Sequence, residues 1–304
     1  MKISELSIQE ALQQKRYLEA FELCKQADKA NSQIGYTMGK ALEGLGFYLS
    51  AVNRFQEALK LNPHDLIIQE VLQRVTPKAL AFHQQVHIPK STSKASAVIL
   101  INTDSRHLKV CLENLLSQTP EISELILVVN TSSYYIDEYL YDLKKKYAEK
   151  VYFVFSFNPN LPSSALNAAI DMSHNTYVIV LDPSTFVTCG WFARMEQVLL
   201  QSSADIVVPT FPYLPQFYSE SDILEEYAQQ QALALKAHWR TIEQDLSSYL
   251  ILVKKDIFRT IKGFESSSLT GAKVLKEFCL EALKANLKIG LTESVVMYSL
   301  ITFC

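Results

Sequence analysis

The chain has 304 residues, of which 48% are hydrophobic and 20% charged, and its formal net charge at pH 7 is −3. This length is enough for two domains with separate hydrophobic cores. The small negative charge excludes a protein that binds nucleic acid mainly by electrostatic attraction. No apolar run reaches the roughly 18 residues of a membrane span. The five cysteines are scattered without a CxxC pair, and no signal-peptide core opens the chain, so we expect a cytoplasmic protein with reduced thiols.

Residues 1–75 contain only helix-like patterns, and these patterns repeat. The two copies share the positions Tyr17, Ala20 and Ala27, which recur as Tyr48, Ala51 and Ala58. The second copy, Gly39–Pro63, resembles the tetratricopeptide repeat at Gly39, Ala41, Leu45-Gly46, Tyr48, Ala51, Phe55, Ala58-Leu59 and Asn62-Pro63. The resemblance implies an all-α domain of antiparallel helices. Two roles stay open for it, namely a groove for a protein partner and an element for docking or self-association.

Two further segments follow the repeats. Leu66–Leu72 is predicted to form a helix that closes the last repeat. Residues 76–94 lose the helical pattern and gather Pro77, Pro89 and a polar run at 91–94, which predicts a linker, with a short helix at Leu80–Val86 as the alternative.

The remaining part, residues 95–304, begins with apolar runs separated by segments of helix length. The runs are Ala97–Thr103, Leu125–Asn130, Val151–Ser156 and Tyr177–Asp182. Their continuous apolarity and spacing predict βαβ units and a parallel sheet buried on both faces. Functional residues of such sheets gather beyond the carboxyl ends of the strands. The residues expected there are Asn102-Thr103-Asp104, Asn130-Thr131-Ser132 and Asp182-Pro183-Ser184.

The order of motifs from Ala95 to Val296 resembles family 2 glycosyltransferases of the GT-A fold. The matching segments are Leu115–Thr119, Asn167, Leu181-Asp182-Pro183, Leu250–Val253, Lys255-Asp256, Phe258, Gly263-Phe264-Glu265 and Glu277–Ile289. The resemblance implies an α/β domain of the GT-A type that transfers a sugar from a nucleotide-sugar donor to a glycan or protein acceptor. It does not name the sugar or the acceptor.

The resemblance also implies roles for individual residues. Asn102, Asp104, Asn130, Asn167 and Asp182 match positions around the donor. Asp182 and Ser184 match the ends of the metal motif, which would hold Mn²⁺ or Mg²⁺ through hard oxygen ligands. Glu277, with Glu265 as the alternative, matches the carboxylate that removes the acceptor's proton.

The chain departs from the family pattern at several of these positions. Ser184 replaces the second aspartate of the metal motif, and Asn130 replaces the aspartate that binds the base. The late histidine is absent, and Lys276-Glu277 replaces an acidic pair. Two functions therefore remain: a glycosyltransferase with a weak or unnecessary metal, and an inactive GT-A scaffold that binds a partner through its repeats.

Some of these residues also have simpler interpretations. Asp182 could be a turn residue, Glu277 could belong to the solvated face of a helix, and Asp104 could cap the following helix. The amphipathic segment Ser221–Trp239 predicts a helix that packs either over the pocket or against the repeats.

Overall fold

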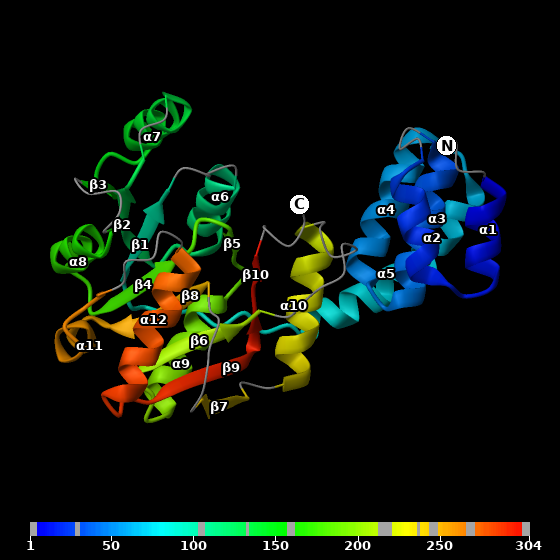
Figure 1. Cartoon of the computed structure of the whole chain (residues 1–304). Helices are drawn as coiled ribbons and strands as arrows, with labels where there is room; N and C mark the ends of the chain where they lie inside the picture. Colours follow the sequence, from blue (N-terminus) through cyan, green and yellow to red (C-terminus); the bar gives the residue numbers. More distant parts are fainter. Residues whose placement is uncertain are drawn as a thin grey trace. The chain divides into compact units, whose positions relative to one another are not determined.

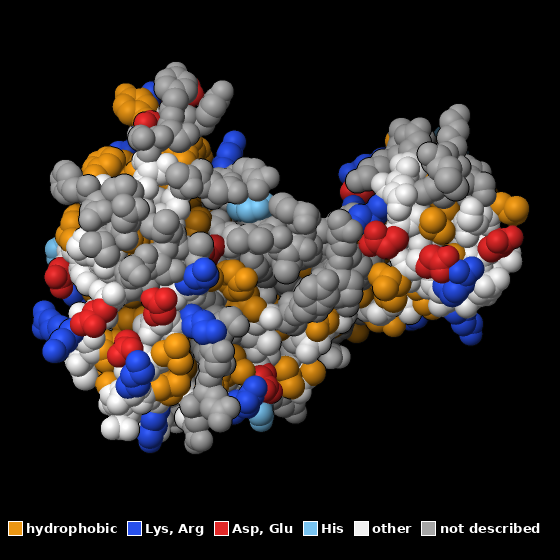
Figure 2. Space-filling model, viewed as in Figure 1, with side chains coloured by type: hydrophobic (Ala, Val, Ile, Leu, Met, Phe, Trp, Pro, Cys, Tyr) orange, Lys and Arg blue, Asp and Glu red, His pale blue; other side chains and the backbone are white. Residues whose placement is uncertain are grey.

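The structure is a computed structural model, which describes residues 5–27, 31–102, 107–131, 134–156, 162–211, 221–235, 238–242, 249–265 and 271–299. The chain divides into two compact units. The first comprises Met1–His87 and Leu214–Leu233, and the second Ile88–Tyr213 and Ala234–Cys304. Each unit has a hydrophobic core of its own. On the face drawn in Figure 2, basic and acidic side chains are interspersed. No single sign of charge dominates the described residues there.

In the described part of the first unit, all regular elements are helices (Figure 1). Its helices are α1 (Glu5–Gln13), α2 (Tyr17–Lys25), α3 (Ser32–Leu45), α4 (Tyr48–Leu61), α5 (Leu66–Gln85) and most of α10 (Ser221–Leu235). Helices α2 and α4 begin at the two tyrosines that the sequence repeat aligns. The small residues Ala20, Ala51 and Ala58 are fully buried, as close helix packing requires. Gly46 ends α3 in the left-handed conformation, with φ of 88°, which glycine adopts without strain.

Helix α5 is longer than the sequence pattern indicated. It starts where Asp65 accepts hydrogen bonds from the N–H groups of Ile67 and Ile68, and it continues through Pro77 to Gln85. Val75 and Ala79, on either side of the proline, are buried. Their packing maintains the helix although Pro77 removes one backbone hydrogen bond. The expected closing helix at Leu66–Leu72 and the short helix at Leu80–Val86 are therefore parts of one helix.

Helix α10 packs against the helices of the first unit, which decides the question that the sequence left open. Ile223 is fully buried in that unit's core. The Glu226 carboxylate accepts hydrogen bonds from Leu49 N at 3.0 Å and from Ser50 N and Oγ, both at 2.8 Å. Arg54 pairs with Asp222 at 3.3 Å. This helix is separated from α4 by more than half the chain, so only the tertiary structure shows the contact.

The second unit is built on an eight-stranded sheet in the order β3-β2-β1-β4-β8-β6-β9-β7. Its strands are β1 (Ala95–Ile101), β2 (Ile122–Val129), β3 (Val151–Phe155), β4 (Tyr177–Leu181), β6 (Ile206–Thr210), β7 (Trp239–Ile242), β8 (Leu250–Lys254) and β9 (Ile289–Val296). A small second sheet pairs β5 (Thr185–Phe186) with β10 (Tyr298–Ser299).

The four predicted strands are present and pair in parallel, as expected. The sheet as a whole is mixed, because β8 runs antiparallel to β4 and β6, and β7 runs antiparallel to β9. The expectation of burial on both faces is correct for β1 and β4, whose residues are all buried. It is wrong for β3, which lies at the edge of the sheet and leaves Tyr152 37% and Phe155 60% exposed.

Helices cover both faces of the sheet and create two cores. One core packs the sheet against α6 (Leu108–Gln118), α7 (Tyr134–Lys146) and α9 (Trp191–Gln201). The other packs it against α8 (Ser163–Met172), α11 (Lys255–Thr260) and α12 (Gly271–Lys284). This three-layer arrangement leaves the carboxyl ends of the parallel strands as the edge where a site can form.

The buried carboxylate of Glu226 generates a testable pH dependence. Burial raises its pKa, and the hydrogen bonds from Ser50 and Leu49 oppose that shift only in part. The Glu226 contribution to stability is therefore complete below its unfolded pKa of about 4.3 and is lost as pH rises through the higher folded pKa. We expect Glu226→Gln to remove this component, which urea unfolding of both proteins between pH 4 and pH 7 would measure. Identical pH profiles for the two proteins would contradict the assignment.

Candidate functional site

The strand register brings the predicted strand ends to one edge of the sheet. Strand β1 lies between β2 and β4, with Ile101 opposite Val129 and Ile99 opposite Leu181. Because all three strands are parallel, Asn102, Asn130 and Asp182 leave the sheet on the same side. The residues at 103–106 and 132–133, including the candidate Asp104, lie outside the described part of the chain.

Asn102 and Asn130 are in direct contact. The Nδ2 atom of Asn130 donates to Oδ1 of Asn102 at 2.9 Å, and the Asn130 backbone N–H donates to Ile101 O at 2.9 Å. Only 7% of the Asn130 surface is exposed. The neighbouring strand ends thus place two amide side chains together, where amides can donate to and accept from a nucleobase edge.

The Asp182 carboxylate is committed to the fold through both of its oxygens. Oδ1 accepts the backbone N–H of Ser184 at 2.9 Å and also the Ser184 hydroxyl. Oδ2 accepts the backbone N–H of Ala272 at 3.1 Å, in the first turn of α12. Asp182 is 7% exposed and Ser184 is 3% exposed. The negative charge therefore satisfies the start of α12 and tightens the turn after β4.

These contacts bear on the divalent cation that the sequence resemblance implied. A hard cation needs several charged or strongly polar oxygens. Here Ser184 offers a neutral hydroxyl that already donates to Asp182. Within the described residues, no group of three or more His, Cys, Asp or Glu side chains could hold a metal. Asp182 and Ser184 therefore do not fit the family's metal site, and no other described residues supply one.

Asn114 is a structural residue of this site that the sequence reasoning missed. It lies in α6 and is 8% exposed. Its Nδ2 donates to Val187 O at 3.0 Å, and its Oδ1 accepts from Val187 N at 2.7 Å. These bonds fix the chain that leaves Asp182. The available signal was a polar residue in a segment whose apolar residues recur at helical spacing, namely Leu108, Cys111, Leu112, Leu115 and Leu116.

Asn167 plays a comparable part on the other face of the sheet. Its amide accepts from Phe264 N at 2.8 Å and donates to Phe264 O at 2.9 Å. The preceding Gly263 has φ of 77°, and a Cβ atom there would lie 2.4 Å from Asn167 Oδ1. Both amide atoms thus hold the Gly263-Phe264 turn, so the geometry of Asn167 is that of a positioning residue.

The two candidate bases are solvent-exposed. Glu277 is exposed in α12, whereas Val274, Phe278 and Cys279 of the same helix are buried, and Glu265 follows the Gly263-Phe264 turn. The backbone N–H of Ala272 links α12 to the Asp182 carboxylate. This contact ties the helix of Glu277 to the end of β4.

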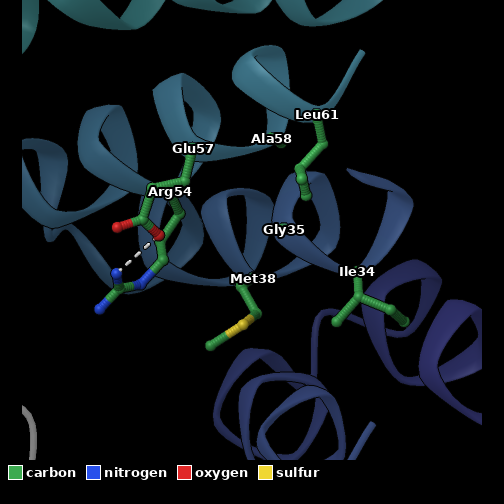
Figure 3. A pocket seen from close by; sticks show the side chains of 7 residues that line it. All are labelled: Ile34, Gly35, Met38, Arg54, Glu57, Ala58 and Leu61. Atoms are coloured by element: carbon green, nitrogen blue, oxygen red, sulfur yellow. Dashed lines mark hydrogen bonds and ion pairs between the residues drawn. The ribbon is translucent and has the colours of Figure 1, made fainter. Parts of the chain in front are cut away.

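The first unit contains a separate, small cavity of about 100 Å³ between α3 and α4 (Figure 3). It is lined by Ile34, Gly35, Met38, Arg54, Glu57, Ala58 and Leu61. Ligand pockets usually measure ~300–1,000 Å³. The cavity is too small for a peptide.

Comparison with known proteins identifies the family of the second unit. Residues 96–261, more than half of the chain, match the family described as Glycosyl transferase family 2. The chain belongs to glycosyl transferase family 2. No curated protein matches it. The match ends before α12, so it covers Asp182 and Ser184 but not Glu277.

Solved structures share the fold of this family 2 domain. One is a crystal structure of GalNAc-T7 with UDP, GalNAc and Mn²⁺, with 13% identity and a TM-score of 0.53 over 69% of this chain and 44% of that one. Another is the mannosyltransferase PcManGT from Pyrobaculum calidifontis with GDP-Man and Mn²⁺, with 12% identity and a TM-score of 0.51 over 74% of this chain and 64% of that one. The chain spans less than two thirds of either protein. At these identities the likeness establishes the GT-A-like fold alone.

The role of Asp182 can be tested through stability. Asp182→Ala would leave the N–H groups of Ser184 and Ala272 without their acceptor, which we expect to cost about 2 kcal/mol of unfolding free energy. Urea denaturation measured by circular dichroism would show the loss. Glu277→Ala, on the exposed face of the same helix, is the control and should stay within about 0.5 kcal/mol of the parent. A fully stable Asp182→Ala protein would show that the carboxylate has no structural role.

Proposed function

We propose that this family 2 protein is a glycosyltransferase that binds a nucleotide-sugar donor at the carboxyl ends of β1, β2 and β4 and acts without the family's metal site. The observation that carries the proposal is the contact between Asn102 and Asn130 at that edge. Polar groups at the ends of parallel strands are where ligands of open α/β sheets bind. The donor classes in the structurally similar proteins, UDP and GDP-Man, support a nucleoside diphosphate.

The proposal assigns distinct tasks to the chain's residues. It assigns nucleotide binding to the amides of Asn102 and Asn130 and, from the sequence, to Asp104. Asp182 orders the turn and α12 instead of binding a cation, and Ser184 supports it. Glu277 accepts the acceptor's proton, and Asn167 positions the Gly263-Phe264 turn. In a related enzyme, a divalent cation would neutralise the departing diphosphate. Asp182 and Ser184 do not fit the role of its ligands, so the proposed reaction does not use a cation.

A second candidate function is a partner-binding GT-A scaffold. The observation that favours it is the use of both Asp182 oxygens inside the protein. The helical unit would then be the main binding element. Helices α2 and α4 start at the repeated residues Tyr17 and Tyr48, which supports the tetratricopeptide interpretation. The partner of the helical unit would be a protein or a second copy of the chain.

Calorimetric titration with UDP and GDP, with and without Mn²⁺, tests the first function. We expect one nucleotide to bind without metal, and Mn²⁺ to change its affinity less than tenfold, which is about 1.4 kcal/mol. Asn130→Ala should weaken binding at least tenfold because it removes the amide at the strand end. Asn53→Ala, exposed in the helical unit, is the control. Absence of binding to either nucleotide would refute donor binding and leave the scaffold.

Restoring the second aspartate tests why the metal site is absent. Ser184→Asp would bury a second carboxylate beside Asp182, so we expect a lower melting temperature without metal. Mn²⁺ should then raise the melting temperature of this variant, since a ligand that binds only the folded state stabilises it. The parent protein should show no such rise. A rise of equal size in the parent would mean that Asp182 and Ser184 already bind the ion.

A further inference from the structure

The two edges of the eight-stranded sheet differ in how they are protected. Its end strands are β3 and β7 (Figure 1). Natural proteins usually protect a sheet edge with charged side chains, prolines, bulges or a very short strand. Strand β7 follows this rule, since it has four residues and its Arg240 forms an ion pair with Glu293 at 3.0 Å. Strand β3 contains only Val, Tyr and Phe, and its register with β2 has no bulge.

Alternate residues of β3 direct their backbone groups away from the sheet. Lys150 O accepts from Leu125 N at 2.7 Å, and Ser156 N donates to Val129 O at 2.9 Å. In a parallel pair, the residues that bond to the neighbouring strand alternate along the chain, so the even-numbered residues of β3 face β2. The outer edge therefore carries the N–H and C=O groups of the odd-numbered residues, Val151, Phe153 and Phe155.

The outward groups at the start of β3 already have partners within the domain. Val151 N donates to Tyr147 O at 3.0 Å, and Val151 O accepts from Lys144 Nζ at 2.5 Å. In the part of the chain that the structure describes, no hydrogen bond reaches the outward groups of Phe153 and Phe155. These two residues therefore offer two N–H and two C=O groups to a further strand.

Apolar side chains on both faces of β3 are also exposed. On one face, Tyr152 is 37% and Met172 of α8 is 44% exposed, and both line a hollow of about 240 Å³. On the other face, Phe155 is 60% exposed, and its ring centroid lies 6.3 Å from that of Phe153. An uncharged edge with unpaired backbone groups and exposed aromatic rings is a template for pairing with another strand.

We propose that β3 pairs with β3 of a second copy of this chain, antiparallel about a two-fold axis at Val154. Phe153 of each copy then lies opposite Phe155 of the other. Each such pair exchanges two N–H···O=C bonds, so the two pairs use all four outward groups that Phe153 and Phe155 offer. An axis at Phe153 would instead place Phe155 opposite Val151, whose groups are already bonded. The unpaired groups therefore select one register.

The side chains of β3 suit pairing with a second copy. In the proposed register the Phe rings meet Phe rings and Val154 meets itself, and cross-strand aromatic pairs stabilise sheets. No like charges meet within the strand, because β3 has no charged residue. A two-fold contact is also closed, since both copies use the same edge. Stable interfaces bury about 1,600 Å², and a short strand pair is smaller, so we expect a reversible dimer. This inference does not depend on the transferase proposal.

Sedimentation velocity of the full chain over a series of concentrations tests the dimer. We expect a monomer–dimer equilibrium whose dissociation constant rises at least tenfold in Phe155→Lys, because the substitution places a charge at the edge. Leu200→Lys is the control, since Leu200 is 65% exposed in α9 and lies outside the proposed contact. It should leave the dissociation constant unchanged. A parent chain that stays monomeric throughout, or a dimer that Phe155→Lys does not weaken, would overturn the proposal.

Cysteine crosslinking tests the register without a charge at the edge. The Cα atoms of a non-hydrogen-bonded antiparallel pair lie about 4.5 Å apart, within the reach of a disulfide. Val154→Cys should therefore form a disulfide-linked dimer under mild oxidation, seen by non-reducing electrophoresis. Tyr152→Cys is the control, because position 152 would lie opposite Ser156 and roughly 13 Å along the strand from its counterpart. The parent chain gives the background from its own cysteines. Crosslinking of Val154→Cys no greater than that of Tyr152→Cys would refute the two-fold pairing.

Discussion

The second unit depends on one buried carboxylate at the end of a central strand. Asp182 follows β4, accepts from the turn at Ser184 with one oxygen, and accepts from the start of α12 with the other. It therefore connects three elements that come from different parts of the sequence. A carboxylate at a helix start is favourable for the backbone dipoles, and the hydrogen bonds to both of its oxygens leave fewer lone pairs for a hard cation. The carboxylate that stabilises this edge is thus the one that matches the start of the family's metal motif.

Near Asp182, two other polar side chains also hydrogen-bond to the backbone of a distant segment. Amide side chains at Asn114 and Asn167 pair with the backbone of Val187 and Phe264, and each pair fixes a segment beside the strand ends. The Asn102–Asn130 pair is different, because it joins side chain to side chain at the edge itself. Asn114 and Asn167 therefore stabilise the backbone beside the strand ends, whereas Asn102 and Asn130 place amide groups at the strand ends themselves. It is the reason that the proposed donor contacts rest on Asn102 and Asn130.

In the helical unit, the first turn of α4 is capped by a residue that is distant in the sequence. Helix α4 lacks a local acceptor, and Glu226 provides one from the insertion between β6 and β7. The cavity between α3 and α4 has a volume of about 100 Å³, which is below the ~300 Å³ of usual ligand pockets.

The sequence by itself determined the elements whose signals are local. Continuous apolar runs predicted β1 to β4 and their parallel pairing, ordered motifs indicated the family, and the repeat indicated the paired starts of α2 and α4. Tertiary structure decided what depends on partners far away in the chain. Pro77 remains helical because Val75 and Ala79 are packed, β3 is half-exposed because it lies at the sheet edge, and Asp182 is a structural acceptor because Ala272 reaches it. Hydrogen bonds and burial join residues that no local pattern relates, and for this reason the role of a matching residue could not be read from its position in a motif.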